Sequence, residues 1–473
     1  MAGLPNIAAL PSAPSIQPDS PSALPGTRPV GHRGSAAAHF TRAFHDTSQP
    51  LSLSRQKRTR EALLLTFIDP IPKECLRLWL LTRAEWQEAL HWLDTAGLAL
   101  YFLGRLREEN LDALLPDWVH ARLSQNLADN KERTAALLAE SRSLHAWFQR
   151  AGLSYATLKG FSLDSHSVPA LELRAQLDFD FLVAQSSAAE ARRILEERGF
   201  ALRGHHGRSW EFGAHDDESI TIRDLYKPIP HRWVELHIEA DASPLLQRAE
   251  MRRMHGTAMP VLDPVDLFLG QGLHIYKHLR YEVTRPSHLL EFRRHVLARS
   301  SDDLFWRELR ARAALDARHP VGLGIVILLI ERLMGPFAPP ALTHWTVDNL
   351  PPAVCLWIET CAHAAILVDP PGTKLYLLLQ EALASSGIPA TRTVRRALFP
   401  NIVPHSLRPL ISRIVAHRPA DSRSPAIVAR GPRKGWRHHL CLMASRLRFH
   451  LFEDLRYLRA RHRFRKALSL IAS

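Results

Sequence analysis

The segment Leu177–Val183, which reads LDFDFLV, constrains the fold more than any other part of the chain. Acidic and aromatic residues alternate through its first half, and a period of two is typical of a β-strand. In a strand, Asp178 and Asp180 project from one face, while Phe179 and Phe181 are buried on the other. The chain must therefore supply a hydrophobic layer beneath the phenylalanines. The aspartates face either water, as on an edge strand, or a bound cation.

The two aspartates form a candidate metal site. Carboxylates this close repel each other unless a cation holds them, and hard oxygen ligands suit Mg²⁺, which completes its shell with water and substrate phosphates. A second alternating segment, Val234–Glu239, places Glu235, His237 and Glu239 on one face. If that strand lies beside the first, it adds a third carboxylate. Such a set is what two-metal phosphoryl-type transfer requires, since one ion activates the attacking oxygen and the other stabilises the leaving pyrophosphate.

A turn upstream of the two aspartates is a candidate phosphate-binding element. The short apolar segment 154–158 predicts a strand, and Lys159 and Gly160 follow it directly. Glycine at such a turn lets the backbone approach a phosphate, and the N-terminus of the helix-like segment expected at 161–166 favours anions. The sequence therefore predicts that the turn and the two aspartates act together.

The rest of the chain divides by composition and periodicity. Residues 1–56 are rich in Pro, Ala and Ser and predict a disordered tail. Helical periodicity dominates residues 60–150 and 243–400. Short strand-like segments around one helix occupy 151–242, where Ser187 and Glu190 predict a capping box at the helix start. The expected fold class is therefore α+β, with a small mixed β-sheet core flanked by N- and C-terminal helical regions. The predicted core strands are 154–158, 177–183, 209–212, 220–223 and 233–238.

The charge of the chain lies mainly at its end. The formal net charge is +14, and residues 405–473 alone hold sixteen basic and three acidic residues. Within this basic tail, apolar residues recur at three- and four-residue steps, with arginines at most other positions, which predicts an amphipathic basic helix over 436–468. The apolar residues are Leu440, Met443, Leu447, Leu451, Leu455 and Leu458. Such a helix contacts an anionic membrane, nucleic acid phosphates or the slightly acidic body of the protein itself.

Other features exclude several classes of protein. The four cysteines are scattered and form no CxxC pair, which argues against a disulfide framework or a zinc ribbon and fits a reducing compartment. The longest apolar run, around 322–329, is too short to span a bilayer and predicts a buried helix. The N-terminus lacks the pattern of a signal peptide. We therefore expect a cytoplasmic protein. Its basic tail is a reason to expect that it also attaches to the surface of a membrane.

The order of these motifs resembles a known family. LKG, an arginine, DxDxLV, a helix that ends at glycine plus an aromatic residue, and VELH together resemble the uncharacterised bacterial nucleotidyltransferase family, within the DNA polymerase β-like nucleotidyltransferase superfamily. The resemblance extends over roughly 85–400. It implies that Asp178, Asp180 and Glu235 are the catalytic, metal-binding carboxylates, although the family more often has Asp at the third position.

The resemblance also implies a set of nucleotide-binding residues. Lys159 and Gly160 replace the glycine–serine turn of the wider superfamily, and Ser162 would supply the missing hydroxyl. Arg174 matches the arginine that precedes DxD, where it either clamps a phosphate or pairs with a nearby acid. His237 matches the family's histidine, which would orient a ligand or touch the substrate.

Two functions follow as expectations. The first is a nucleotidyltransferase that depends on Mg²⁺ or Mn²⁺ and moves a nucleoside monophosphate from NTP to an unknown acceptor, which is a small molecule, glycan, peptide or protein. The alternative is a catalytically inactive nucleotide-binding module whose basic tail, 405–473, contacts membrane or nucleic acid. The glutamate at position 235 and the charge of the tail favour this alternative.

Overall fold

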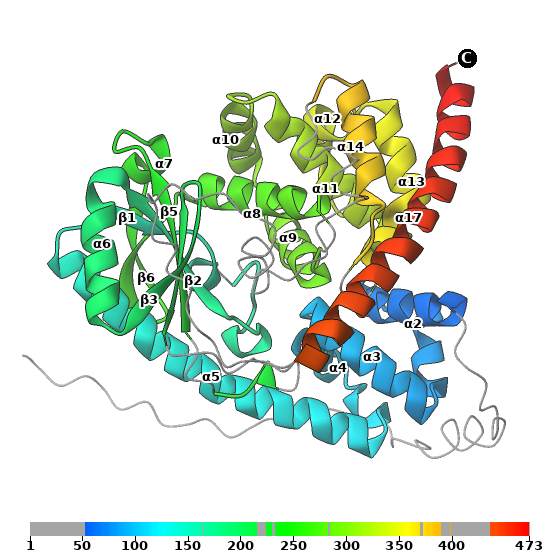
Figure 1. Ribbon diagram of the computed structural model, residues 1–473, viewed down its shortest axis with the longest axis horizontal. Coiled ribbons are helices and arrows are strands. Elements are labelled where there is room, and N and C mark those ends of the chain that lie inside the picture. Colours follow the sequence, from blue (N-terminus) through cyan, green and yellow to red (C-terminus); the bar gives the residue numbers. More distant parts are fainter. Residues whose placement is uncertain are drawn as a thin grey trace, which may run out of the picture. The chain divides into compact units, whose positions relative to one another are not determined.

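The computed structural model describes residues 53–163, 165–214, 224–228, 232–281, 284–368, 372–388, 398 and 436–472. Most of the predicted disordered tail, the predicted strand at 220–223 and the first part of the basic tail lie outside these residues. The described residues form one seven-stranded mixed sheet with helices before and after it in the chain (Figure 1). The expected α+β class is therefore confirmed.

The candidate site residues lie at the centre of the sheet. Strand β2 pairs in parallel with β5 on one side and antiparallel with β1 on the other. Across the sheet the order is β3-β4-β5-β2-β1-β7-β6. The strands are β1 (Tyr155–Thr157), β2 (Asp178–Ala184), β3 (Phe200–His206), β4 (Ser209–Ala214), β5 (Arg232–Glu239), β6 (Glu250–Met254) and β7 (Thr257–Val261).

The sheet extends beyond the core that the sequence predicts. Strands β6 and β7 follow position 242, in a region expected to be helical, and form an antiparallel hairpin. Its turn consists of His255 and Gly256, whose φ values are +50° and +79°. Positive φ at both turn residues is the geometry of a tight two-residue hairpin turn. The tight turn therefore allows a hairpin to form, although the sequence on either side of it shows only a weak strand pattern.

One face of the sheet is a hydrophobic core. Phe179 and Phe181 of β2 are buried there, as the alternation predicts. They pack with Leu144 and Phe148 of α5 (Asp117–Arg150) and with residues of α6 (Gln185–Glu197). Both helices lie on the same side of the sheet in Figure 1.

Helix α6 starts in a different way from the one predicted. Ala184 precedes its first turn and provides no side-chain cap. The hydroxyl of Ser187 instead accepts a hydrogen bond from the backbone N–H of Ser154, at 3.0 Å. The predicted capping box is therefore wrong, because the segment that leads into β1 binds this hydroxyl.

The other face of the sheet is covered only in part. Ala156 and Leu182 pack there against Leu262 and Leu267, at the beginning of α8 (Pro264–Leu279). Toward the start of β2 this cover ends, and a cavity lies between the sheet, α8 and α9 (Pro286–Ala298). The cavity is lined by carboxylates from the sheet and by basic residues from the helices.

A second hydrophobic core joins the helices on both sides of the sheet in the chain. The apolar run at 322–329 forms part of it, so the prediction of a buried helix is confirmed. No helix in the described ranges combines the length and the apolar character that crossing a bilayer requires. The remaining helices are α2 (Leu53–Leu65), α3 (Arg83–Ala96), α4 (Ala99–Glu108), α7 (Pro244–Gln247), α10 (Asp303–Ala313), α11 (Arg318–Met334), α12 (Pro340–Thr346), α13 (Pro352–Ile366), α14 (Tyr376–Ser385) and α17 (Trp436–Ala472).

Candidate functional site

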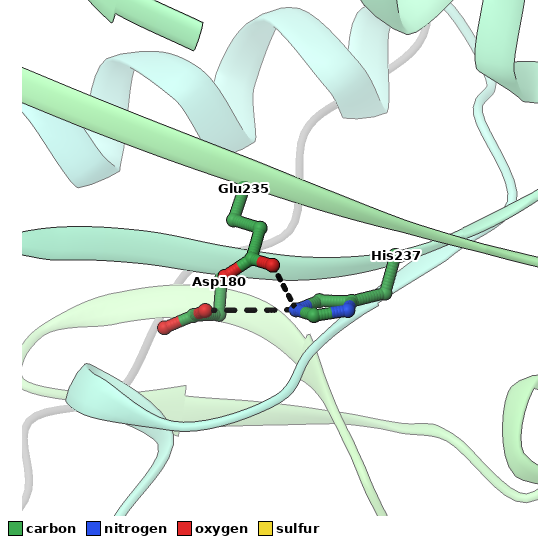
Figure 2. Close-up of side chains that lie close together, drawn as sticks. All are labelled: Asp180, Glu235 and His237. Carbon is green, nitrogen blue, oxygen red and sulfur yellow. Dashed lines mark ion pairs between the residues drawn. The ribbon is translucent and has the colours of Figure 1, made fainter. Parts of the chain in front are cut away.

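Two parallel strands bring the predicted carboxylates together. Asp180 of β2 pairs in register with Glu235 of β5, so their side chains leave the sheet on the same face. His237 lies two positions further along β5 and turns toward both. Its Nε2 is 3.7 Å from Asp180 Oδ1 and 3.5 Å from Glu235 Oε1. Figure 2 shows the three side chains converging.

Among the residues that the structure describes, these three form a group that suits a metal ion. Each offers one ligand atom, and the three atoms lie within 4.8 Å of one another. Two carboxylate oxygens and one imidazole nitrogen are suitable donors for a divalent ion such as Mg²⁺ or Mn²⁺. Asp178, which the sequence predicts as a ligand, is not part of this group but lines the same cavity. His237, expected to orient a ligand or touch the substrate, is a member of this candidate metal group.

The predicted turn supplies a cation. Lys159 lies directly after β1, and its Nζ is 2.9 Å from Asp180 Oδ1. Burial opposes the charge of Lys159, but the carboxylates of Asp180 and Asp178 outweigh it and raise the pKa of the lysine. The Asp180 carboxylate thus has a positive partner within the chain.

Gly160 has a positive φ of +70°, and a Cβ atom there would lie 2.6 Å from the amide nitrogen of Gln176. That amide donates to the backbone oxygen of Asp178 at 2.9 Å. The glycine therefore leaves room for the side chain that holds the start of β2. Ser162 is buried, and its hydroxyl has no hydrogen-bond partner among the described residues. Neither Gly160 nor Ser162 belongs to the cavity lining.

The cavity sets the charge state of its acids. Burial and the charge of Asp180 raise the pKa of Asp178. The adjacent imidazole of His237, against the effect of burial, lowers the pKa of Glu235, and a hydrogen bond from Ser209 lowers it further. Burial disfavours the imidazolium of His237, but its ion pairs with Asp180 and Glu235 raise its pKa to about 9. The group therefore carries both signs of charge at neutral pH, and His237 must release its proton before its ring nitrogen binds a metal ion.

Arg174 has a carboxylate partner. Its Nε donates to Glu291 Oε1 at 3.1 Å, and the Tyr101 hydroxyl donates to the same oxygen at 2.9 Å. Arg174 Nη1 also donates to Gln176 at 3.4 Å. The sequence allows this arginine either to clamp a phosphate or to pair with a nearby acid, and in the structure it pairs with an acid. Arg174 still lines the cavity, as Glu291 does.

The cavity itself has a volume of about 580 Å³. Opposite the carboxylates, α8 and the start of α9 contribute Lys277 and Arg285. The described residues provide no ion pair for either, in contrast to Arg174 and Lys159. Cations with a carboxylate partner have their charge balanced within the protein, whereas cations without one are available to an anionic ligand.

Three histidines complete this wall. The ring centroids of His274 and His278 are 4.5 Å apart, and those of His274 and His288 are 5.3 Å apart. Burial, reinforced by nearby cations, lowers the pKa of all three, that of His274 to about 3, so the rings are neutral donors and acceptors. Sequence reasoning missed His274 and His288; the signal available was the spacing of His274 and His278 on one face of a helix.

Comparison with known proteins gives a match to a family, not to an individual protein. No curated protein matches the chain. The model of a family described as uncharacterised nucleotidyltransferase matches residues 82–335, more than half of the chain, and this range contains every residue of the site described above. The match begins near the start of the expected resemblance, whereas residues 336–400 fall outside it. The chain therefore belongs to the uncharacterised nucleotidyltransferase family, and its role at this general level is nucleotidyl transfer.

Proposed function

We propose that the protein is a nucleotidyltransferase that depends on Mg²⁺ or Mn²⁺ and moves a nucleoside monophosphate from NTP to an acceptor in the cavity. One observation carries the proposal. On the sheet side of the cavity, Glu235 and His237 belong to the group that suits a divalent ion, and the third member of that group, Asp180, lies behind the lining. On the helical side are two cations, Lys277 and Arg285, for which the described residues provide no ion pair. A metal–nucleoside triphosphate complex needs both kinds of partner.

The acidic and basic residues of the site would bind different parts of the substrate complex. Asp180, Glu235 and His237 would hold a divalent ion, which when bound neutralises charge that develops on the transferring phosphate. Lys277 and Arg285 would bind the polyphosphate, with Arg285 able to make bidentate contacts. Positioning and neutralisation of charge then do most of the catalytic work.

The reaction exchanges one phosphorus–oxygen bond for another bond to phosphorus. The acceptor's nucleophilic atom bonds to the α-phosphorus, the bond to the bridging oxygen of the β-phosphate breaks, and pyrophosphate leaves with the electron pair. A proton of the acceptor is released to solvent. Bidentate contacts from Arg285 would hold the leaving pyrophosphate in line with the attacking atom.

Labelled NTPs of the four bases, incubated with the protein and cell extract, test the proposal. Mass spectrometry then identifies the labelled acceptor. We expect transfer that requires Mg²⁺ or Mn²⁺ and that is lost in Asp180→Asn. Glu239→Gln is the matched control, because Glu239 lies on the same face of β5 as Glu235 but outside the candidate metal group. Equal transfer by the wild type and Asp180→Asn would contradict the proposal.

A catalytically inactive nucleotide-binding module is the second candidate. The contact between Lys159 Nζ and Asp180 Oδ1 favours it, because the lysine balances this carboxylate without a metal ion. Calorimetry with NTP, with and without Mg²⁺, separates the two. Binding that is unchanged by Mg²⁺ and is followed by no product identifies the module, whereas release of pyrophosphate identifies the enzyme.

A further inference from the structure

Helix α17 is attached to the protein body along one face. His450, Tyr457 and Phe464 lie at seven-residue steps along it and are buried. The helix packs there against α13 and α14 (Figure 1). Seven residues are nearly two full turns, so these side chains form one line along the helix. The predicted amphipathic basic helix is therefore present, but its attachment does not use the predicted leucine stripe.

Polar contacts fix the rotation of α17 about its axis. Lys374, whose side chain is fully buried, forms an ion pair with Asp454. Glu381 accepts a hydrogen bond from the Tyr457 hydroxyl and forms an ion pair with Arg461. Glu453 accepts from the backbone N–H of residue 374 at 3.0 Å. Because a buried lysine without its partner is costly, these contacts hold the helix in one orientation.

The predicted leucine stripe lies on a different face of α17 and is exposed. Its leucines are between 46 and 60 % exposed, and they lie about a quarter turn from the buried line, at 100° per residue. The stripe extends over about 27 Å at 1.5 Å per residue. An apolar strip of this length on a surface marks an interaction site. The exposed leucines of the stripe are Leu440, Leu447, Leu451, Leu455 and Leu458, whereas Met443, which the sequence also places in it, is partly buried.

Basic side chains border the leucine stripe. Arg448, Arg459, Arg463 and Lys466 lie on the side away from the protein body, and no ion pair to any of them is found among the described residues. The acidic residues of the helix, Glu453 and Asp454, are both engaged on the attached side. The free face therefore combines leucine with uncompensated positive charge.

We propose that this leucine–arginine face of α17 binds an anionic lipid surface, lying in the plane of the interface. The leucines would enter the acyl boundary and the basic side chains would contact lipid phosphates. A second copy of the chain would bring like charges together, and nucleic acid would leave the leucines in water.

The full-length protein is tested by co-sedimentation with vesicles of phosphatidylcholine alone and of phosphatidylcholine with 30 mol % phosphatidylglycerol. We expect binding to the anionic vesicles only, weakened by salt. Leu451→Ser with Leu455→Ser lowers the partition coefficient at least about tenfold. Arg459→Gln with Arg463→Gln lowers it roughly thirtyfold, by loss of attraction to lipid phosphates. Leu304→Ser, at an exposed leucine on α10, is the matched control and leaves binding unchanged.

Circular dichroism verifies that α17 stays folded in each variant, and Leu451→Ser alone replaces the double variant if helix content falls. Light scattering reports the oligomeric state. The proposal is overturned if the wild type binds neither vesicle, or if the leucine variants bind as the wild type does. It is equally overturned if the wild type is a dimer that the leucine variants dissociate and that does not bind vesicles.

Discussion

The two faces of strand β2 differ in what their side chains contribute: one face is apolar and buried, and the other carries carboxylates. On one face, Phe179 and Phe181 are buried against α5 and α6 and gain the free energy of leaving water. On the other face, Asp178 and Asp180 are held close together, with the pKa of Asp178 raised by burial and by its neighbour. One face stabilises the sheet, and the other lowers stability in return for a site. Changes on each face should therefore affect different properties.

The largest expected effect is on activity, at Asp180. Asp180→Asn removes a carboxylate of the candidate metal group and the partner of Lys159, so under the proposed function we expect nucleotidyl transfer to fall by a factor of about a thousand or more. The fold should survive, because the substitution also removes repulsion between carboxylates. Transfer assays and thermal unfolding of the same preparation measure both properties. A variant that loses activity only by unfolding would break the comparison.

On the opposite face, Phe181→Ala should act on stability. Deleting a fully buried phenylalanine leaves a cavity beneath the centre of the sheet, and the free energy of unfolding should fall by about 3–5 kcal/mol. Urea denaturation measures it. The protein that remains folded should keep its affinity for Mg²⁺ within a few-fold. A large loss of metal affinity in the folded variant would show that the two faces are not independent.

The buried face should also make stability depend on pH through His145. Burial lowers the pKa of His145 to about 4, and its Nδ1 lies 2.9 Å from the Tyr155 hydroxyl. Below pH 6.5, His145 binds a proton in the unfolded chain but stays neutral in the folded protein until the pH nears 4. The free energy of unfolding should therefore fall by roughly 3 kcal/mol as the pH falls from 6.5 to 4. Denaturation at several pH values should show a flatter profile for His145→Gln, and identical profiles would refute this assignment.

The smallest effect is expected on the helical wall of the cavity. Arg285→Met should weaken the binding of inorganic pyrophosphate about ten- to a hundredfold, because it removes charge-assisted hydrogen bonds of roughly 1.5–3 kcal/mol. Isothermal titration calorimetry measures it. Arg280→Met, a change in the same connection between α8 and α9 but outside the cavity lining, provides the control. Equal losses in both variants would indicate a general effect of charge and not a binding site.

The candidate site could be predicted from local sequence patterns, because its side chains lie on two strands with period-two alternation. The alternation of LDFDFLV and of VELHIE determines which side chains share a face, and only the pairing of β2 with β5 had to be assumed. The hairpin of β6 and β7 was missed, since EMRRM shows no apolar alternation and the strand signal lies in the turn at His255 and Gly256.

The orientation of α17 could not be predicted for a different reason. The helix has two apolar stripes, and its own sequence does not rank them. Residues far away in the chain decide, since Lys374 and Glu381 bind the side that carries Tyr457. The same holds for Arg174. Its sequence context allows either a phosphate contact or an ion pair, and the acid that pairs with it, Glu291, lies far away in the chain on α9.

The parallel pairing of β2 and β5 has a consequence for the growing polypeptide. Glu235 follows Asp180 by 55 positions, and a parallel neighbour can join only after the intervening β-hairpin has been made. A nascent chain that ends before β5 has two aspartates but lacks their glutamate and histidine partners. Contacts of such high sequence separation form slowly. Metal affinity should therefore appear only when the sheet closes, so that a half-made or misfolded copy cannot act on nucleotides.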